Sequence, residues 1–475
     1  MSAPTIVWFR QDLRLDDNVA LAAALEQSRN VVPLFIWSPD EEGGRAPGGA
    51  GRWWLHHALC DLQQQLAGCN LRLTIRQGTA EQVLRDVAKD TGAERIYWSR
   101  RYEPEAIQRD SRLKTTLKDA GFDVDSFNSS LLVEPWKVAK QDGGPYKVYT
   151  PYSKEVLKHA LPEPVKVDMQ QAIGPGKWPQ SLKVDELGLL PKISWDAGFN
   201  AAWDPTREGG LKRLNDFVQH SASDYADARN LPAEDGTSRL SPYLHWGQIG
   251  PREVVAALGK RAEKGGGHTF LKELIWREFG YHILYHFPKT VIEPMNDRFR
   301  AFPWTQDEKA LQAWQRGQTG YPIVDAGMRQ LWATGWMHNR VRMIVGSLLV
   351  KHLLLPWQEG EQWFWDTLVD ADLASNILGW QWIAGCGADA APYFRIFNPM
   401  TQAEKFDPDG AYIRQWVPEL VKLPTKYLSA PWEAPENVRE YAKVELGETY
   451  PWPIIDHQKG RERALKAFEK VKTKD

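Results

Sequence analysis

Residues 5–37 read TIVWFRQDLRLDDNVALAAALEQSRNVVPLFIW, and this stretch sets the pattern of the first part of the chain. Its two ends, 5–9 and 31–37, are short apolar runs of the kind found in strands that are buried on both faces. Residues 18–28 between them have helical periodicity. A strand, a helix and a second strand in this order predict a parallel pair joined by a helical crossover.

The same alternation continues to residue 130. Two more apolar runs, 71–75 and 95–99, are predicted strands. The stretches expected to be helical read RWWLHHALCDLQQQLA, TAEQVLRDVAKDTG and EAIQRDSRLKTTLKDAG. Residues 1–130 are therefore expected to form an α/β domain, with a doubly wound parallel sheet that carries helices on both faces.

The composition changes after this domain. Residues 131–200 are rich in Pro, Gly and Lys, which predicts a long connector. From residue 201 strand signals almost vanish and helical periodicity dominates. Residues 201–475 are therefore expected to form a large all-α domain.

The overall composition excludes several classes of protein. A net charge of -2 argues against a uniformly basic nucleic-acid binder but allows a local basic patch. The three cysteines form no CxxC pair, which fits a reducing cytoplasm and argues against a four-cysteine iron–sulfur cluster. No secretory signal is recognisable, and the longest apolar stretch, 343–355, is interrupted by Lys351 and His352. A cytoplasmic protein without a membrane span is expected.

No known phosphate-binding glycine pattern follows the first predicted strand. The turn at 10–14 reads RQDLR and lacks GxGxxG. The glycine-rich stretch 43–51 matches neither that pattern nor a P-loop, and is expected to be a flexible surface loop.

Tryptophan is the most unusual component, with 23 copies, most of them after Trp203. Several stand beside charged or amide residues, in 276–278, 336–340 and 376–382. Indole stacks well on flat heterocycles and is oxidisable, so recognition and electron transfer compete here with ordinary core packing.

One candidate site combines Tyr225 and Arg229 with the run Gly-Thr-Ser-Arg-Leu-Ser-Pro at 236–242. Hydroxyls and backbone N–H groups just ahead of a helix can hold an anion. The alternative is a helix cap beside a surface loop.

A second candidate contains Glu273, Trp276 and Arg277, which share one helix face with Gly280. Burial beside an indole would favour a protonated carboxyl group that donates a hydrogen bond. The alternative is an i,i+4 surface pair between Glu273 and Arg277.

A third candidate places Asp372, Asn376 and Trp380 on one stripe of a helix, with Asp370 near its start. The run Trp336-x2-Asn339-x2-Arg342-Met343 is comparable. Two carboxylates and an amide in an apolar segment are costly to bury without a polar partner. No His or Cys joins at ligand spacing, so a flat ligand with polar edges is favoured over a metal.

Together these segments resemble the DNA photolyase and cryptochrome family, and most closely a bacterial cyclobutane pyrimidine dimer photolyase. The resemblance covers nearly the whole chain. The segments that carry it read WFRQDLRLDDNVAL, GTSRLSPYLHWG, ELIWREF, GYPIVDAGMRQL, TGWMHNRVRM, DADLASNILGWQW and APYFRIFNPMTQAEKFDPDGAYIRQW. The family joins an α/β antenna domain to a helical domain that holds FAD in a folded conformation, which implies dinucleotide binding without GxGxxG.

Carried over by position, the resemblance implies an FAD site. Its expected residues are Tyr225, Thr237, Ser238, Arg239, Leu240, Ser241, Phe270, Arg277, Asn339, Arg342, Asp370, Asp372 and Asn376. Arg342 and Asp370 are expected to pair, and Asn376 to face flavin N5. Phe270 and Gly280 depart from residues common in several bacterial members. The resemblance also implies an electron-transfer chain of Trp380, Trp357 and Trp304.

The same resemblance implies a substrate. Glu273, Met343 and Asn376 are the expected catalytic residues, and Glu273, Trp276 and Met343 match members that repair cyclobutane pyrimidine dimers. The implied partner is ultraviolet-damaged DNA. The residues expected to bind it are Arg229, Trp276, Arg340, Arg395, Gln402 and Lys405.

A second, antenna chromophore is implied less specifically. Arg52 and Glu103 are the candidates for binding methenyltetrahydrofolate or a deazaflavin, and Gln248 stands where deazaflavin-binding members can have Lys. The chain is expected to be a monomer with no obligate protein partner. A cryptochrome-type photosensor and a (6-4) photolyase are the alternatives to a cyclobutane dimer photolyase.

Overall fold

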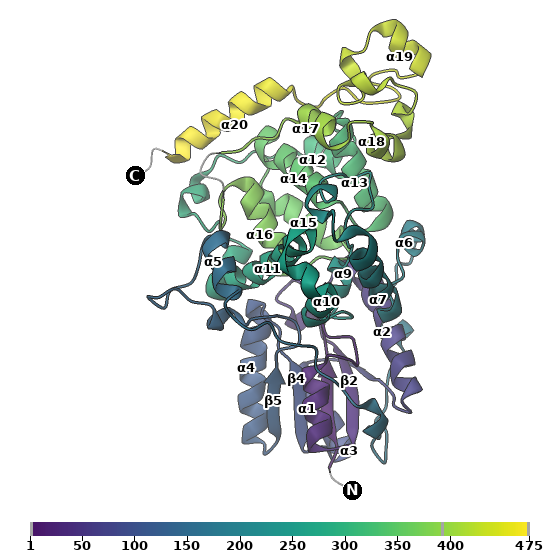
Figure 1. Cartoon of the computed structure of the whole chain (residues 1–475), viewed down its shortest axis with the longest axis vertical. Coiled ribbons are helices and arrows are strands. Elements are labelled where there is room, and N and C mark those ends of the chain that lie inside the picture. Colours follow the sequence, from purple (N-terminus) through teal and green to yellow (C-terminus); the bar gives the residue numbers. More distant parts are fainter. Residues whose placement is uncertain (1–2, 391–393, 473–475) are drawn as a thin grey trace.

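The computed structural model describes residues 3–390 and 394–472. A sheet with its helices forms one end of the molecule and a mass of helices forms the other (Figure 1). The sheet has the order β3-β2-β1-β4-β5, and all its pairs are parallel. Its strands are β1 (Thr5–Phe9), β2 (Val31–Trp37), β3 (Thr74–Gln77), β4 (Arg95–Ser99) and β5 (Asp123–Phe127).

Four of these strands were predicted from apolar runs, and one was missed. The central strands β1 and β2 are buried almost throughout, as both-face burial requires. The edge strand β5 reads DVDSF, and its residues alternate between exposed and buried. It lacks an apolar run because one of its faces meets water. β3 starts at Thr74, three residues later than expected.

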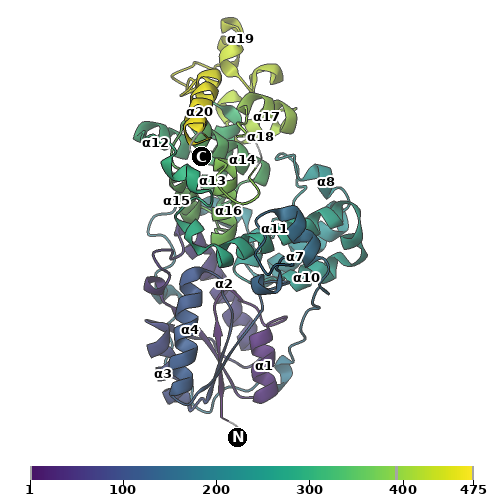
Figure 2. The ribbon, with the colours of Figure 1, turned by 90° about the vertical axis from the view of Figure 1, so that its left-hand side faces the viewer.

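Helices cover both faces of the sheet, which confirms the doubly wound α/β prediction (Figure 2). Val7, Phe9 and Val31 point into a core shared with α1 (Val19–Gln27) and α2 (Gly49–Gly68). Alternate residues point to the other face, against α3 (Ala80–Thr91) and α4 (Pro104–Asp119). The period of two in a strand therefore supplies two separate cores.

The segment 131–200, expected to be a connector, packs against both parts of the molecule. Leu132 and Val133 are buried, and their backbone N–H groups donate to the carboxylate of Glu278. The short helix α5 (Tyr149–Val156) lies against α11 (Gly265–His286). This part of the chain therefore contributes walls to the helical domain. The exact domain boundaries stay a prediction.

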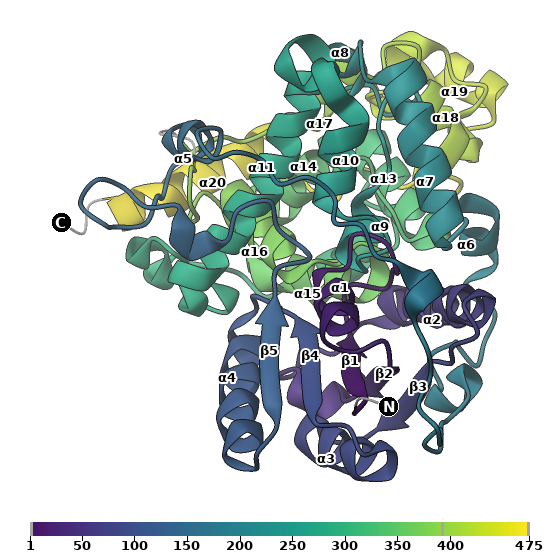
Figure 3. The same ribbon diagram turned by 60° about the horizontal axis from the view of Figure 1, so that its bottom comes forward.

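The helical domain is built around α11, which packs against α16 (Leu373–Ala384), α8 (Tyr225–Ala228) and α5. Figure 3 shows this group above the sheet. The remaining helices are α6 (Ala197–Ala202), α7 (Arg207–Asp216), α9 (Ser241–His245), α10 (Pro251–Leu258), α12 (Glu308–Gln315), α13 (Pro322–Thr334), α14 (Asn339–Ser347), α15 (Trp357–Thr367), α17 (Pro399–Phe406), α18 (Ala411–Trp416), α19 (Glu436–Ala442) and α20 (His457–Lys472).

The two parts are locked together by buried arginines. Arg14 donates to the carbonyls of Gly247 and Ser129, at 2.7 Å each. Asp17 accepts from Arg252 at 2.8 Å. Gly247 has φ +70°, and a Cβ there would lie 2.0 Å from the carbonyl oxygen of Gln11, so only glycine allows this approach. In the described ranges, every helix is too short or too polar to span a bilayer.

Candidate functional site

Three segments far apart in sequence meet at the buried carboxylate of Asp370. Arg342, on α14, donates to both its oxygens at 3.1 and 2.9 Å. The hydroxyl of Ser241, at the start of α9, donates to it at 2.6 Å. The expected Arg342–Asp370 pair is therefore present. Ser241 itself is exposed, so this buried pair stands at the edge of open space.

Asp372 and Asn376 begin the next helix, α16, as the stripe pattern predicted. Asp372 is its N-cap and accepts from Ser375 N at 2.8 Å and from the hydroxyl of Tyr281. His245 Nδ1 lies 3.6 Å from Asp372 Oδ2, the oxygen that accepts from Tyr281. Burial opposes ionisation of Asp372, but His245, Arg277 and the Tyr281 hydroxyl together hold its pKa well below the ordinary value. A permanent carboxylate is fixed here.

Asn376 is oriented by a carboxylate that the sequence did not single out. Its amide nitrogen donates to the backbone oxygen of Glu361 at 3.0 Å and to its carboxylate at 2.9 Å. Glu361 is fully buried and pairs with Arg45 at 2.6 Å. Burial raises the pKa of Glu361, which Arg45 opposes. This chain of contacts runs from the α/β domain to the helix start that carries Asn376.

A cationic cluster surrounds His338, which precedes α14. Its Nδ1 accepts from Arg340 N at 3.2 Å, so Nε2 carries the ring proton. Nε2 has no partner among the described residues, although the ring is 1% exposed. Burial and the charges of Arg340, Arg342, Arg239 and Arg229 lower the pKa of His338 to about 3. An unpaired donor inside a ring of arginines suits an anionic ligand.

The predicted catalytic residue Glu273 lies at the rim of this cluster. It pairs with Arg229, whose guanidinium also lies 5.3 Å from the ring centre of Tyr225. The expected alternative, a surface pair with Arg277, is wrong, because Arg277 turns inward and donates to Ser130 O at 2.8 Å. This ion pair therefore joins Glu273, an expected catalytic residue, to Arg229, which is expected to bind DNA.

The other residues expected at the rim gather around Arg340. Its Nη1 lies 3.6 Å from the sulfur of Met343, and its guanidinium lies 4.4 Å from the ring centre of Phe406 on α17. Burial and the neighbouring charges of Arg229 and Arg395 lower the pKa of Arg340. The remaining expected DNA contacts, Gln402 and Lys405, lie on α17. Arg340 and α17, which carries Gln402 and Lys405, therefore lie side by side.

The apolar members of the expected FAD set form a separate wall. Phe270 lies 5.1 Å from Tyr225 between ring centres, and both are buried. Leu240 is 1% exposed, whereas Thr237 and Ser238 are half-buried. Arg239 takes the left-handed conformation, with φ 49°. Asn339 is exposed at the first position of α14, and no contact is assigned to its side chain.

Both parts of the chain match models of known protein families. The model described as the FAD binding domain of DNA photolyase matches residues 270–470, and that described as DNA photolyase matches residues 5–170. The chain is 49% identical to a deoxyribodipyrimidine photo-lyase of Agrobacterium fabrum, covering 99% of this chain and 98% of that protein. The chain belongs to the DNA photolyase family.

Solved structures of the family share the whole fold. A bacterial class III photolyase from Agrobacterium tumefaciens superposes with a TM-score of 0.95 at 49% identity, covering 99% of this chain and 98% of that one. A Synechocystis cryptochrome gives 0.90 at 29% identity, covering 98% and 99%. Cryptochrome-2 of Arabidopsis thaliana is 41% identical, covering 99% of this chain and 80% of that protein. Photolyases and cryptochromes are both relatives.

The residues present fit the family's FAD. The unpaired donor of His338 and the cations around it offer positive and donor groups for a pyrophosphate. Asp372 offers a fixed acceptor to a ring N–H or a ribose hydroxyl. The helical part of this photolyase-family protein is therefore an FAD-binding domain whose donors converge on one region.

The three tryptophans of the expected electron-transfer chain differ in exposure. Trp380 is 4% exposed and packs against Phe364 and Trp314. Gly360 allows its approach, since a Cβ there would lie 2.1 Å from the indole. Trp357 is 1% exposed at the start of α15, and Trp304 is half-buried. Of the three, only Trp304 reaches solvent appreciably, and the electron-transfer role of the set stays a prediction.

The two antenna candidates do not meet. Arg52 lines a cavity of about 370 Å³ together with Trp195, Trp332 and Lys192. Glu103 pairs with Arg101 at 3.1 Å beside a different, much smaller space. The two candidates therefore belong to different cavities.

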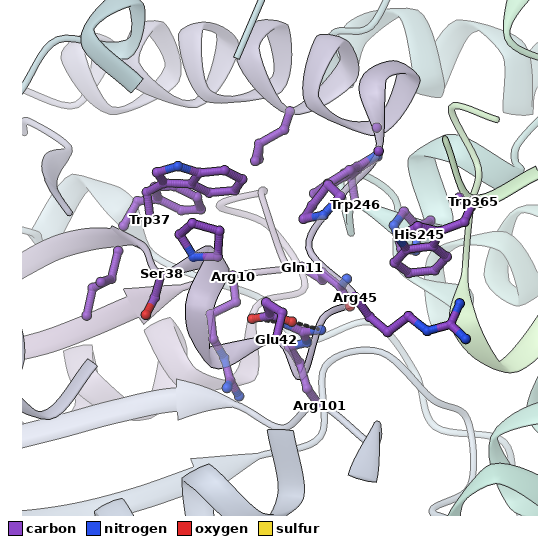
Figure 4. Close-up of a pocket in the computed structure, with 18 of the residues that line it drawn as sticks. Arg10, Gln11, Trp37, Ser38, Glu42, Arg45, Arg101, His245, Trp246 and Trp365 are labelled. Atoms are coloured by element: carbon purple, nitrogen blue, oxygen red, sulfur yellow. Dashed lines mark hydrogen bonds and ion pairs between the residues drawn. The ribbon is translucent and has the colours of Figure 1, made fainter. Parts of the chain in front are cut away.

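A further arginine-rich cavity, of about 70 Å³, opens at the carboxyl ends of β1 and β2 (Figure 4). Arg10, Arg101 and Glu42 lie on one side of it and Trp246 and Trp365 on the other. Its volume admits a few water molecules but no chromophore.

The glycine-rich stretch 43–51 and Gln248 are both held by contacts with other parts of the chain. The glycine-rich stretch 43–51 is not a free surface loop, because a Cβ at Gly48 would lie 2.3 Å from Cα of Asp366. It is clamped onto α15. Gln248 is fully buried, and its side-chain oxygen accepts from Trp54 Nε1 at 2.8 Å.

Some residues of the site were missed from the sequence. His338 lies in the stretch 336–340, which stands out by its tryptophan, but no pattern in the sequence assigns His338 a role. Glu361 and Arg45 lie 316 positions apart, and neither belongs to a recognisable pattern. Tyr281 shared the helix face of Arg277, as the i,i+4 spacing with that residue could have indicated.

Proposed function

We propose that this protein uses light to repair cyclobutane pyrimidine dimers in DNA. The observation that carries the proposal is the ion pair Glu273–Arg229. Glu273 shares α11 with Trp276, and Arg229 interacts electrostatically with Arg340, which contacts Met343. A carboxyl group, an indole and a thioether suit two apolar, carbonyl-bearing pyrimidines. The name of the 49% identical relative supports the same reaction class.

FAD, when reduced and excited by blue light, supplies one electron. In the proposed reaction the electron enters the dimer, the two carbon–carbon bonds that join the pyrimidines break, and the electron returns, so no net oxidation or reduction occurs. The protein's tasks are to hold the dimer at the flavin, to exclude water and to stabilise the extra charge. Preorganised donors perform the last task without acid–base turnover.

Arg229 has two partners in this scheme. Without DNA it neutralises Glu273. A phosphate of the damaged strand offers a stronger, bidentate partner to the guanidinium. When Arg229 turns to that phosphate, the carboxyl group of Glu273 is released to form a hydrogen bond with the edge of a pyrimidine. Arg340, Arg395, Gln402 and Lys405 hold the flanking backbone.

Asn376 acts through its fixed orientation. Glu361 accepts from its amide nitrogen, so the amide cannot rotate freely about its last bond. Trp380, Trp357 and Trp304 provide the route by which an oxidised flavin is reduced before repair. This tryptophan route is expected to prepare the active, reduced protein, and the repair reaction itself does not use the route.

The test illuminates reduced, FAD-loaded protein with ultraviolet-irradiated DNA and counts the remaining dimers. We expect loss of cyclobutane dimers under blue light and none in the dark. Glu273→Gln, which keeps a donor, should retain a larger repair yield than Glu273→Ala, with FAD content and DNA affinity similar in both. Equal repair yields in wild type and Glu273→Ala would remove Glu273 from the mechanism.

A photosensor without repair activity is the second candidate, since Cryptochrome-2 and Cryptochrome-1 of Arabidopsis thaliana are 41% and 39% identical to this chain. In that case the same experiment would give flavin photoreduction and an unchanged number of dimers. Substituting (6-4) photoproducts as the lesion tests the third alternative in the same assay.

A second chromophore is proposed for the 370 Å³ cavity between α2, α13 and α15. Trp332 and Trp195 offer stacking faces, and Arg52 and Lys192 offer cations for an anionic tail. Methenyltetrahydrofolate has both features. We expect its absorption band in the purified protein to disappear in Trp332→Ala while the flavin band stays; loss of neither band would contradict this placement.

A further inference from the structure

Tyr149 lies flat against Trp276, although the two residues are 127 positions apart. Tyr149 comes from α5, in the segment expected to be a connector, and Trp276 comes from the middle of α11. Their ring centres are 3.7 Å apart and their planes differ by 6°. Phe279 meets the indole edge-on at 5.7 Å. One face of the indole is therefore covered by protein, and the side chain as a whole is half-buried.

Tyr149 is itself held in place. Its hydroxyl donates to Lys272 O at 2.7 Å, one turn before Trp276 on the same helix. Its backbone N–H donates to the carboxylate of Asp389 at 3.3 Å. The backbone N–H of Asp389 in turn donates to Lys147 O at 3.1 Å. The phenol ring is thus fixed at both ends, between the dimer-binding helix and the segment that follows α16.

The hydroxyl of Tyr149 also lies close to the predicted catalytic carboxylate. Burial and then the charge of Glu273 raise the pKa of Tyr149, so it stays a neutral donor at physiological pH. Arg229 acts in the opposite direction. Tyr149 therefore stacks on Trp276 and also interacts electrostatically with the carboxyl group of Glu273.

We infer that Tyr149 is a positioning residue that fixes the plane of Trp276, so that the free face of the indole meets the flipped-out dimer. This inference rests on the proposed function. An indole without a partner can rotate about its side-chain bonds, and ordering it on binding weakens affinity. A preformed aromatic stack contributes about 0.5–1.5 kcal/mol, equivalent to roughly a two- to tenfold change in affinity.

A double-mutant cycle tests the inference. The variants are Tyr149→Met, which removes the ring and keeps apolar volume, Tyr149→Phe, Trp276→Leu, and Tyr149→Met combined with Trp276→Leu. The dissociation constants are measured in the dark for an oligonucleotide that carries one cyclobutane dimer and for the same sequence without damage.

We expect Tyr149→Met to weaken binding of the dimer about two- to tenfold and to leave undamaged DNA unaffected. Tyr149→Phe should stay within about twofold of wild type, because the stack survives. In the Trp276→Leu background, Tyr149→Met should add nothing. Equal losses in both backgrounds, or equal losses for both DNAs, would overturn the inference.

Tyr152 offers a matched control on the same helix. It is fully buried and lies 5.1 Å from Phe279 between ring centres, with no stack on Trp276. If Tyr149 acted only as core, Tyr152→Met should reduce dimer discrimination as much as Tyr149→Met does, and the inference would fail. FAD content and melting temperature are recorded for each variant; should Tyr149→Met lose FAD, Tyr149→Leu carries the same cycle.

The outcomes separate this inference from the function on which it rests. If the wild-type protein does not distinguish damaged from undamaged DNA, the proposed function fails. If wild type discriminates and Tyr149→Met discriminates equally well, only the role of Tyr149 fails.

Discussion

Two regions of the molecule concentrate arginines, and they differ in how those charges are balanced. In the α/β domain Arg10 pairs with Asp110 at 2.8 Å, and Arg101 pairs with Glu42 at 2.8 Å. Although burial opposes it, Arg101 and Arg109 hold the pKa of Glu42 below its ordinary value. Each of these two guanidinium groups already has a carboxylate partner.

The region around His338 in the helical domain differs, because four arginines lie near one imidazole. Burial, and then the repulsion of these arginines, lower the pKa of His338 to about 3. Asp370 and Glu273 each neutralise only one guanidinium among the assigned ion pairs. Arginine content alone therefore does not mark an anion site. A buried donor without a partner, such as His338 Nε2, is a better mark when cations exceed carboxylates around it, and we expect FAD and DNA to bind in that region.

The largest expected effect comes from removing the cation beside Asp370. Arg342→Gln leaves a buried carboxylate without its partner, a change that typically costs about 3–5 kcal/mol. We expect FAD affinity to fall about a hundredfold or more. The measurement is the flavin-to-protein absorbance ratio after dialysis. Arg109→Gln, in the balanced region, is the control and should keep its flavin; loss of flavin in both variants would erase the distinction.

A smaller effect is expected at the rim. Arg340→Gln should weaken binding of damaged and undamaged DNA alike, by roughly tenfold, and should reduce the slope of log K against log salt by about 1. Fluorescence anisotropy across a salt series measures both. A variant that lost affinity for damaged DNA alone would show that Arg340 contacts the lesion and not the backbone.

The pH dependence of stability sharpens the comparison further. The pKa of His338 falls to about 3 in the folded chain, mainly through burial. Its contribution to stability is therefore complete above the unfolded pKa of about 6.5 and is lost as pH falls from there toward 3. His338→Asn should flatten the slope of unfolding free energy between pH 6 and 4 by up to about 1.4 kcal/mol per pH unit.

Urea unfolding at a series of pH values supplies that slope. His282 and His352, whose pKa values burial lowers to about 4 each, add to the total in both proteins and cancel in the comparison. An unchanged slope in His338→Asn would mean that the imidazole is not held neutral by its surroundings.

The smallest effect is expected from the balanced region. In Glu103→Gln, Arg101 keeps Glu42 at 2.8 Å. The free energy of unfolding should fall by less than about 1 kcal/mol, and FAD and DNA binding should not change. Guanidinium unfolding with a flavin assay checks both. A marked loss of a second chromophore in this variant would move the antenna site from Arg52 to Glu103.

Much of the fold could be predicted because burial on both sides leaves a simple mark. The runs of β1 and β2 are apolar throughout, and the helices of the second domain carry clear periodicity. β5 was not predicted because one face of DVDSF is exposed to solvent, so the strand lacks an apolar run. Segment 131–200 was expected to be a connector, since proline and glycine obscure the few residues, such as Leu132 and Tyr149, that it buries.

The site was partly predictable for a related reason. Asp370, Asp372 and Asn376 lie within seven positions, so their convergence follows from one helix start. Contacts such as Arg45–Glu361 and Tyr149–Trp276 depend on which distant segments meet, and no local spacing records that. The antenna candidates failed to converge because each was chosen from a short stretch alone.

Counting flavins per chain tests the central claim most directly. FAD-free protein is titrated with FAD by calorimetry, in wild type and in Arg342→Gln. The account predicts one FAD per chain, lost in the variant, because Arg342 pairs with Asp370 and adds to the positive charge around the unpaired donor of His338. A solved archaeal photolyase from Sulfolobus tokodaii contains two FAD molecules, so a second site is a real alternative. Two flavins per chain, or one that persists in Arg342→Gln, would contradict it.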